Sequence, residues 1–327
     1  MIEQLPSVDA IDATVQAGSM VEIERVAQAQ ASRNALIGNL RELSPYTAQL
    51  PETAASEAYD RVAEAERLVA PTLRREDYRE GTAQFPDEVR VLMGEGALLL
   101  SADHATDPMR RNAVHEGADH GTAGLVGVLH DEGYGTAVMP VGRQTGNANA
   151  DLDHPLKAQL TKRINGKQGF LSVHGMMPGK FTHQYDETEV HGVIGLGAGY
   201  DEAAYDIASD AAKHISDETG LRVVIGNDSR LYLPNALPQL IRDEDGNIKY
   251  SQLAAVGVGT TTNHVRSVSP ATPAMQIELS RAIRFLPEGM EYRDPRAARI
   301  GVYMGLLVTR RLSEIMSTYE QTNPHTL

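Results

Sequence analysis

Apolar residues follow two different spacings along this chain of 327 residues. From about residue 8 to residue 80 they recur at helical spacing in a background rich in Ala, Glu, Gln and Arg, which predicts amphipathic helices. Pro45 and Pro51 predict breaks between these helices. The apolar positions concerned are Val21, Ile23, Val26, Ala29, Val62, Leu68 and Val69.

After about residue 85 the apolar residues gather in short runs that end in Gly, Asn, Asp or His. The runs are rich in leucine and β-branched residues and do not alternate cleanly with polar residues, which favours strands that are buried on both faces. They are VRVLM (89–93), ALLLSADH (97–104), GTAVMPVG (135–142), GFLSVHG (169–175), LRVVIGND (221–228) and AAVGVGTTTN (254–263).

Helical spacing returns between these runs. We expect a helix over 112–133, interrupted by internal glycines, and a clearer one over 201–220 that ends at Gly220. A long C-terminal helix opens at Asp294 and Pro295. This alternation predicts an α/β fold with a mixed, mostly parallel sheet flanked by helices. We divide the chain into an N-terminal helical extension, 1–84, and an α/β catalytic domain, 85–327.

Charge and composition narrow the class of partner. The formal net charge is −14 and the pI is near 5.2, which argues against nucleic acid or an anionic membrane and leaves a small-molecule substrate as the expected partner. A homo-oligomer is compatible with this composition. No signal peptide or membrane-spanning run is evident, and the chain has no cysteine, so we expect a soluble, cytoplasmic protein. Any metal must then be bound by histidine and carboxylate.

Two of the predicted strands end at histidines. His104 closes the run 97–104 and His174 closes the run 169–175. Strand ends converge at one edge of such a sheet, and imidazole is a common zinc ligand, so a Zn²⁺ site is expected there. Asp107, three residues after His104, is the expected carboxylate ligand, with Glu116 and Asp119 as rivals. The alternative for each residue is a loop position, and Asp before Pro is also an ordinary turn signal.

A carboxylate that could act as general base lies in the stretch TPAMQIELSRAI (272–283). Read as a strand, it places Met275, Ile277 and Leu279 on one face and Glu278 on the other. A glutamate in an apolar strand costs stability unless it is paired or wet, so Glu278 is expected in a cleft. The alternative is an edge strand with a solvated polar face, or the first turn of a helix.

Two loops rich in Gly and Asn supply further candidates. They are VGRQTGNANAD (141–151) and GTTTNHVRSVSP (259–270). Arg143 and Arg266 could bind a substrate carboxylate or stabilise an oxyanion, and Asn263 and His264 lie in the second loop beside Arg266.

The order of these motifs resembles the N-formylglutamate amidohydrolase family of the zinc carboxypeptidase-like α/β superfamily. The motifs that match are ADHAT, HEGADHGT, GNANAD, SVHGM, TNHVRS and AMQIELSR, between about residues 95 and 285. The resemblance implies that His104 and His174 bind zinc, that Glu278 acts on water, and that Asn263 and Arg266 belong to a substrate loop. Asn149 matches the first residue of the family's Asn-Arg pair, but Ala150 replaces the arginine.

The activity implied by the resemblance is zinc-dependent hydrolysis of the C–N amide bond of a small N-acyl amino acid or short peptide. Loss of the family's arginine at residue 150 argues against N-formylglutamate itself. A zinc carboxypeptidase or a deacylase for another acyl substrate is the alternative within the enzyme class. A non-catalytic binding or scaffold protein on the same fold is the alternative outside it.

Overall fold

A computed structural model describes residues 51–69, 88–105, 119–141, 144, 146–176, 190–200, 202–226, 230–240, 242, 246–247, 260–286 and 295–322. The predictions for Asp107, Glu116, Arg143 and the run 254–259 lie outside these residues.

The described strands form a single nine-stranded sheet in the order β1-β3-β2-β4-β9-β5-β6-β7-β8. The central strands β3, β2, β4 and β9 run parallel, whereas β1, β7 and β8 pair antiparallel to their neighbours and β5 lies antiparallel to β9. This is the mixed α/β sheet predicted from the sequence. The strands are β1 Glu88–Leu92, β2 Leu98–Ser101, β3 Gly135–Val141, β4 Gly169–Gly175, β5 Gly192–Gly195, β6 Val223–Ile225, β7 Arg230–Tyr232, β8 Gln239–Leu240 and β9 Ala274–Leu279.

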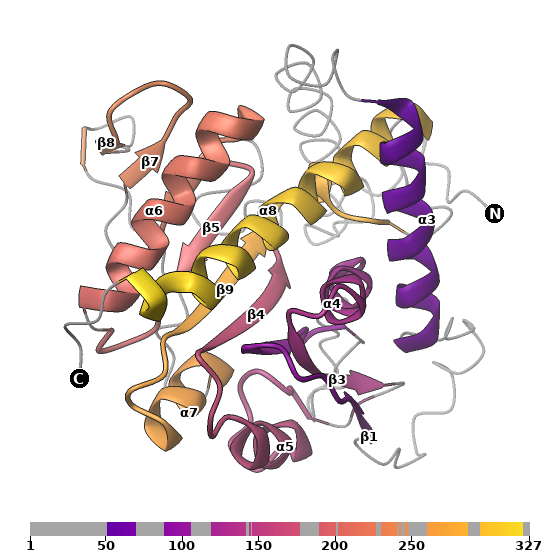
Figure 1. Ribbon diagram of the computed structural model, residues 1–327, viewed down its shortest axis with the longest axis vertical. Helices are drawn as coiled ribbons and strands as arrows, with labels where there is room; N and C mark the ends of the chain where they lie inside the picture. The colour runs from indigo at the N-terminus through magenta and orange to yellow at the C-terminus, as the bar shows by residue number, and fades with distance from the viewer. Residues whose placement is uncertain are drawn as a thin grey trace, which may run out of the picture.

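Helices cover both faces of the sheet (Figure 1). The larger core lies under α4, α6 and α8, and a smaller core lies under α5 and α7 on the opposite face. The helices are α3 Glu52–Val69, α4 Thr122–Asp131, α5 Pro155–Arg163, α6 Glu202–Thr219, α7 Thr261–Val268 and α8 Pro295–Thr322, with a short 3-10 helix, η2, at Arg281–Ile283.

Three expected helices are found, one of them with a different start. Helices α6 and α8 match the predictions, and Gly220 has the left-handed backbone, φ 73°, that ends a helix. Of the helix expected over 112–133, the structure describes residues 119–133. Within them α4 begins at Thr122, because Gly121 has φ 88° and does not fit a right-handed helix.

The stretch 259–270 was expected to be a loop, and this prediction was wrong. Residues Thr261–Val268 form α7, because the Thr260 side chain accepts a hydrogen bond from the Asn263 backbone N–H and caps the helix. The strand expected over 254–263 is also wrong for its last residues, 261–263, which begin this helix. Val265 then buries itself in the smaller core.

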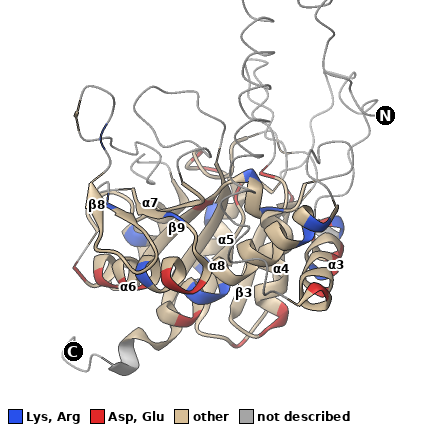
Figure 2. Cartoon of the chain, turned by 90° about the horizontal axis from the view of Figure 1, so that it is seen from above, with Lys and Arg blue, Asp and Glu red and all other residues tan. Residues whose placement is uncertain are grey.

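Helix α3 packs against α4 and α8, and its residues Ala58 and Val62 belong to the larger core (Figure 1). Glu132, the C-cap residue of α4, pairs with Arg61 of α3 at 2.7 Å and with Arg310 of α8. Acidic and basic residues are interspersed along these helices (Figure 2). The division at residue 84 stays a prediction, but at least one helix before that boundary belongs to the layer that covers the sheet.

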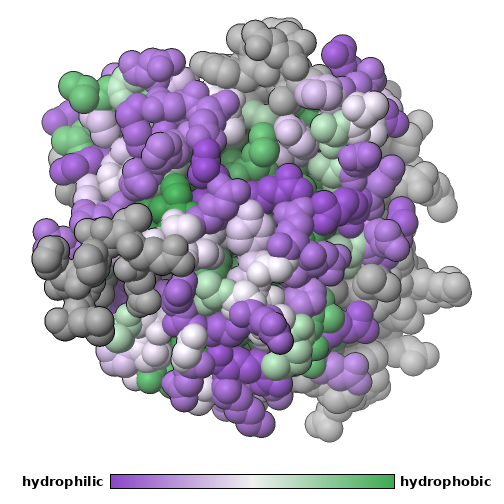
Figure 3. All heavy atoms as spheres, viewed as in Figure 1, coloured by the Kyte–Doolittle hydropathy of each residue, from purple (hydrophilic) through white to green (hydrophobic). Residues whose placement is uncertain are grey.

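On the face shown in Figure 3, apolar side chains form small separate groups among hydrophilic ones. None of the helices in the described part of the chain is both long enough and apolar enough to cross a membrane.

Candidate metal centre

Three neighbouring strands change from apolar to polar as they approach their carboxyl ends. On the face covered by α5 and α7, the register aligns Leu99 of β2, Phe170 of β4 and Ala274 of β9. Two residues further along, the aligned side chains are Ser101, Ser172 and Gln276, and the next aligned pair is His174 and Glu278. The period of two along each strand therefore delivers a compact group of buried polar side chains at one edge of the sheet.

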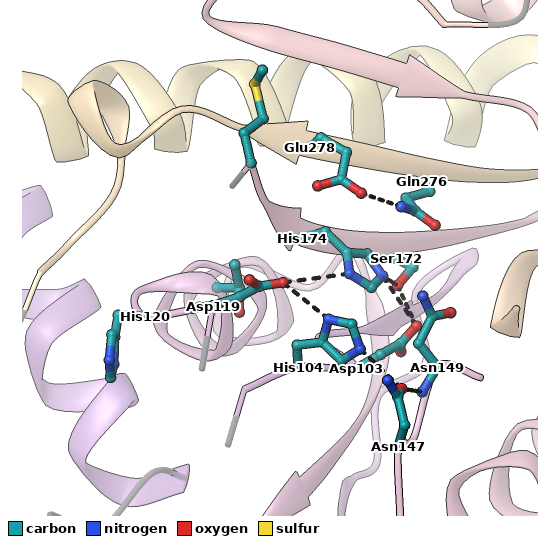
Figure 4. A network of polar contacts seen from close by, with 12 residues as sticks. Asp103, His104, Asp119, His120, Asn147, Asn149, Ser172, His174, Gln276 and Glu278 are labelled. Atoms are coloured by element: carbon teal, nitrogen blue, oxygen red, sulfur yellow. Dashed lines mark hydrogen bonds and ion pairs between the residues drawn. The ribbon is translucent and has the colours of Figure 1, made fainter. Parts of the chain in front are cut away.

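His104, Asp119 and His174 converge at this edge (Figure 4). One ligand atom of each residue lies within 4.8 Å of the other two. Asp119 Oδ2 is 3.4 Å from His104 Nδ1 and 3.5 Å from His174 Nδ1. Tetrahedral ligands at about 2 Å from a zinc ion are about 3.3 Å apart, so these separations suit a shared metal ion.

The remaining nitrogen of each imidazole has a partner that can only accept a hydrogen bond. His104 Nε2 is 3.0 Å from Asn147 Oδ1, an oxygen that also accepts the backbone N–H groups of Asn149 and Ala150. His174 Nε2 is 3.2 Å from Asp103 Oδ2 and 2.9 Å from the Ser172 hydroxyl, which itself donates to Asp103 and so accepts from the imidazole. In its neutral form, each imidazole therefore donates from Nε2, which leaves a lone pair on Nδ1 directed toward Asp119.

Asp119 Oδ2 is buried and has no hydrogen-bond partner among the described residues. Its distances to the two Nδ1 atoms exceed those of charge-assisted hydrogen bonds. Two nitrogen lone pairs and a carboxylate oxygen that face one another repel unless a cation lies between them. The donor set, with its orphaned oxygen, fits a divalent metal ion.

The Asp103 carboxylate binds Nε2 of His174. Asp103 was not among the site residues predicted from the sequence. Its carboxylate also accepts hydrogen bonds from the hydroxyls of Ser101, Ser172 and Thr261. Burial alone would raise the pKa of Asp103, but the hydrogen bond and charge of His174 hold it below the usual range. A carboxylate–histidine–metal arrangement of this kind orients a metal ligand and raises its basicity.

The two imidazoles are basic when no metal is present. Burial alone would lower the pKa of His174, but Asp103 and Asp119 raise it to about 10. The pKa of His104 is also raised, against burial, by Asp119. Protons therefore occupy the site whenever a metal does not.

Glu278 lies beside His174 in the register of β4 and β9 and is 7% exposed. Its carboxylate accepts a hydrogen bond from the amide of Gln276, two residues back on the same face (Figure 4). Burial raises the pKa of Glu278 to about 7, which suits a group that takes and returns a proton near neutral pH. The strand that the alternation predicted is thus present, and its polar face lines the site.

Arg266 lies away from this cluster. Its guanidinium donates to the carbonyls of Leu196, Ala198 and Ala274. Ala274 begins β9, four residues before Glu278, which is about 13 Å along an extended strand. In this structure Arg266 fastens the loop after β5 to α7, and its placement gives no support to a role at the strand ends.

The other predicted substrate residues serve as supports in the structure. Asn263 Oδ1 accepts from the Ala198 N–H at 2.9 Å, and His264 Nε2 faces α5, 2.9 Å from Thr161 Oγ1. Asn149 Oδ1 accepts from the Thr261 N–H at 3.0 Å, and so braces the hydroxyl that binds Asp103.

Among the carboxylates considered for the third ligand, Asp119 is the one that lies within the described residues, and it is in place. His120, which follows it, points away from the cluster (Figure 4).

The structure therefore defines a mixed α/β fold with a candidate metal site, a histidine–carboxylate cluster at the strand ends of its sheet. No family model matches the chain, and no curated protein matches its sequence. A bacteriophage poly-gamma-glutamate hydrolase is 12% identical, with a TM-score of 0.39, over 76% of this chain and 95% of its own.

Two further solved structures are similar at this level. N-formylglutamate amidohydrolase from Ralstonia eutropha JMP134 is 15% identical, with a TM-score of 0.38, over 69% of this chain and 97% of its own. A metallo-carboxypeptidase from Pseudomonas aeruginosa is 15% identical, with a TM-score of 0.33, over 77% of this chain and 68% of its own. Similarity this low concerns the fold alone, so we assign chemistry only from the residues of the site.

Proposed function

We propose that this protein is a zinc-dependent amidohydrolase that cleaves the C–N amide bond of a small N-acyl amino acid or short peptide. The observation that carries the proposal is the orientation of three ligand atoms. The hydrogen bonds at each Nε2 direct the Nδ1 atoms of both histidines toward Asp119 Oδ2, which lies 3.4 and 3.5 Å from them and has no hydrogen-bond partner among the described residues. His104, His174 and Asp119 would hold the metal. When bound, zinc would supply Lewis acidity that acidifies water and polarises a carbonyl group.

The chain's own residues provide the proton transfers. Glu278 is the general base: it removes a proton from the attacking water as the new C–O bond forms, and it returns the proton to the nitrogen as the C–N bond breaks. Its pKa of about 7 leaves it able to accept and to donate at neutral pH. The Gln276 amide holds one carboxylate oxygen and so limits rotation of the side chain.

The polar groups around the cluster maintain the ligand geometry. Asn147 and Asp103 fix the tautomers of the two imidazoles, and Thr261, Ser101 and Ser172 satisfy the rest of the Asp103 carboxylate. These hydrogen bonds hold the two imidazoles in one orientation, and a fixed ligand orientation is what a preorganised catalytic site requires.

Elemental analysis tests the metal first. Purified protein should contain close to one equivalent of zinc, and both His104→Ala and His174→Ala should lose it. His214→Ala is the matched control, because His214 is an exposed histidine of α6. If zinc added to well-folded wild type does not bind, the proposal fails and a binding or scaffold protein becomes the better reading.

Substrate profiling follows with the zinc-loaded protein. A panel of N-acyl amino acids and short peptides, scored for release of the free amine, should yield a substrate whose hydrolysis stops in Glu278→Gln. Release of only the last residue of longer peptides would instead identify a carboxypeptidase. Cleavage of other acyl amides alone would identify a deacylase.

A further inference from the structure

A buried carboxylate of helix α3 binds the start of α4, next to the segment that carries Asp119. Glu66, near the end of α3, is 4% exposed, and both of its oxygens accept backbone hydrogen bonds from the start of α4. Oε1 accepts the Gly121 N–H at 2.8 Å, and Oε2 accepts the Gly124 N–H at 2.7 Å. These are two of the amide groups that a helix start leaves without partners inside the helix.

The start of α4 depends on this outside partner. Its N-cap residue is Gly121, which has no side chain to cap the helix and adopts φ 88°. A carboxylate is the favoured partner for helix N-terminal amides, because it satisfies the donors and complements the helix dipole. Glu66 therefore supplies, from a separate helix, the cap that residue 121 cannot supply itself.

Glycines of α4 allow α3 to come close enough for this contact. A Cβ atom at Gly124 would lie 2.3 Å from the backbone oxygen of Val62, and one at Gly127 would lie 2.9 Å from Cβ of Ala65. The sequence analysis took internal glycines as a weakness in this helix. In the structure, these two are required by the approach of the two helices.

The turn that Glu66 caps is the turn that carries Asp119. The Asp119 carbonyl accepts from both the backbone N–H and the hydroxyl of Thr122, and the Asp119 N–H donates to the carbonyl of His104 at 2.8 Å. Residues 119 to 122 thus form one hydrogen-bonded unit with His104 on one side and Glu66 on the other. A shift of the α4 start would move the Asp119 carboxylate relative to both imidazoles.

Arg284 also binds the turn that carries Asp119. This buried side chain donates from Nη1 to the His120 carbonyl at 3.1 Å and from Nη2 to the Met176 carbonyl at 3.4 Å. Its guanidinium occupies the space where a side chain at Gly175 would lie. Arg284 thereby links the segment that follows Asp119 to the segment that follows His174.

We propose that Glu66 is a positioning residue for Asp119, and that α3 contributes in this way to the geometry of the metal centre. The inference rests on the proposed function, because it assumes that Asp119 is a metal ligand. Glu66 does not touch the metal. It acts by fixing the start of α4, and Arg284 fixes the adjoining peptide groups.

Metal affinity tests this role. The dissociation constant for zinc is measured by competition with a chromophoric chelator for wild type, Glu66→Gln and Glu64→Gln. Glu64 lies on the same helix but is exposed, so its variant is the matched control. We expect a 10- to 100-fold weaker zinc complex for Glu66→Gln, the loss typical of residues that orient ligands, and no change for Glu64→Gln.

The visible spectrum of bound Co²⁺ gives a readout that a general loss of stability would not change. Because the spectrum depends on the number and geometry of ligands, Glu66→Gln should alter it in the same sense as Asp119→Asn, whereas Glu64→Gln should leave it as in wild type. Should Glu66→Gln fail to fold, Glu66→Asp replaces it, because it keeps the charge but is one methylene too short to reach both amides.

The possible results separate the two proposals. A wild type that binds no metal refutes the proposed function, and the role of Glu66 falls with it. A wild type that binds zinc normally, with an unchanged dissociation constant and Co²⁺ spectrum in the Glu66 variant, refutes the positioning role alone.

Discussion

The buried carboxyl of Glu278 should reduce the stability of the metal-free protein as pH rises. Burial raises its pKa from 4.5 to about 7 in the folded state. A raised pKa means that the folded protein holds the proton more tightly than the unfolded chain does. The stabilisation is therefore complete below pH 4.5 and is lost as the pH rises through about 7.

The size of this loss of stability follows from the difference between the pKa values of Glu278 in the unfolded and the folded state. Each pKa unit corresponds to roughly 1.4 kcal/mol, so the difference between 4.5 and about 7 amounts to about 3 kcal/mol for Glu278. Most of that change falls between about pH 5 and pH 8. Glu278→Gln keeps the size and the hydrogen-bonding oxygen of the side chain but has no titration, so it should become progressively more stable than wild type over this range.

Urea denaturation of chelated protein at about pH 5 and pH 8 measures the effect. The difference in unfolding free energy between Glu278→Gln and wild type should increase by about 2 to 3 kcal/mol between the two pH values. The same variant should bind zinc with wild-type stoichiometry and show no turnover. A stability difference that does not depend on pH would show that Glu278 is not buried as an acid, and normal turnover would remove it from the mechanism.

Two further predictions concern the imidazoles. Asp103→Asn should weaken zinc binding 10- to 100-fold, because an amide can present its N–H₂ to His174 Nε2 and favour the wrong tautomer. Asn165→Asp, a change outside the cluster, is the control. Unchanged affinity in Asp103→Asn would contradict the tautomer assignment. Zinc binding near pH 7 should release at least one proton, because the pKa of His174 is about 10 without metal and a histidine ligand is neutral. The affinity for zinc should therefore fall as the pH falls. Calorimetry in buffers of different ionisation enthalpy measures this release, and a heat of binding that is the same in all buffers would argue against it.

The convergence of His104, His174 and Glu278 could be predicted because it follows from local patterns. Each residue lies at or just after the carboxyl end of an apolar run, and parallel strands bring those ends to one edge. The strand period of two then places His174 and Glu278 on the same face. Neither step requires knowledge of the loops.

The third member of the candidate cluster could not be predicted in this way. Asp107, Glu116 and Asp119 all follow His104 within one connecting segment, and their spacing does not say which of them returns to the cluster. In the structure the return of Asp119 depends on its hydrogen bond to the His104 carbonyl and on the start of α4. Those are tertiary contacts, and Glu66, which supports them, lies more than fifty residues earlier in the chain.

The burial of Asp103 could have been predicted from the sequence. It is a charged residue directly after an apolar strand and in phase with Leu99 and Ser101, so it had to be buried on the same face. A buried carboxylate requires hydrogen-bond donors, and histidine and hydroxyl groups on the next strand are suitable ones. The placement of Arg266 could not be predicted, because a loop was expected where α7 forms, and Arg266 on this helix donates to the Ala274 carbonyl at the start of β9.

The cluster as a whole has too much negative charge and too many lone pairs to be stable without a cation. Asp103, Asp119 and Glu278 lie within or beside it, and the surrounding sheet is apolar. Without metal, protons on the imidazoles provide the balancing charge, which is why the pKa of His174 rises to about 10. A divalent ion at Asp119 would displace those protons and bind the oxygen that has no hydrogen-bond partner among the described residues. A metal ion would therefore compete with protons for the same position, which the hydrogen bonds of Asp103 and, on our proposal, of Glu66 keep in place.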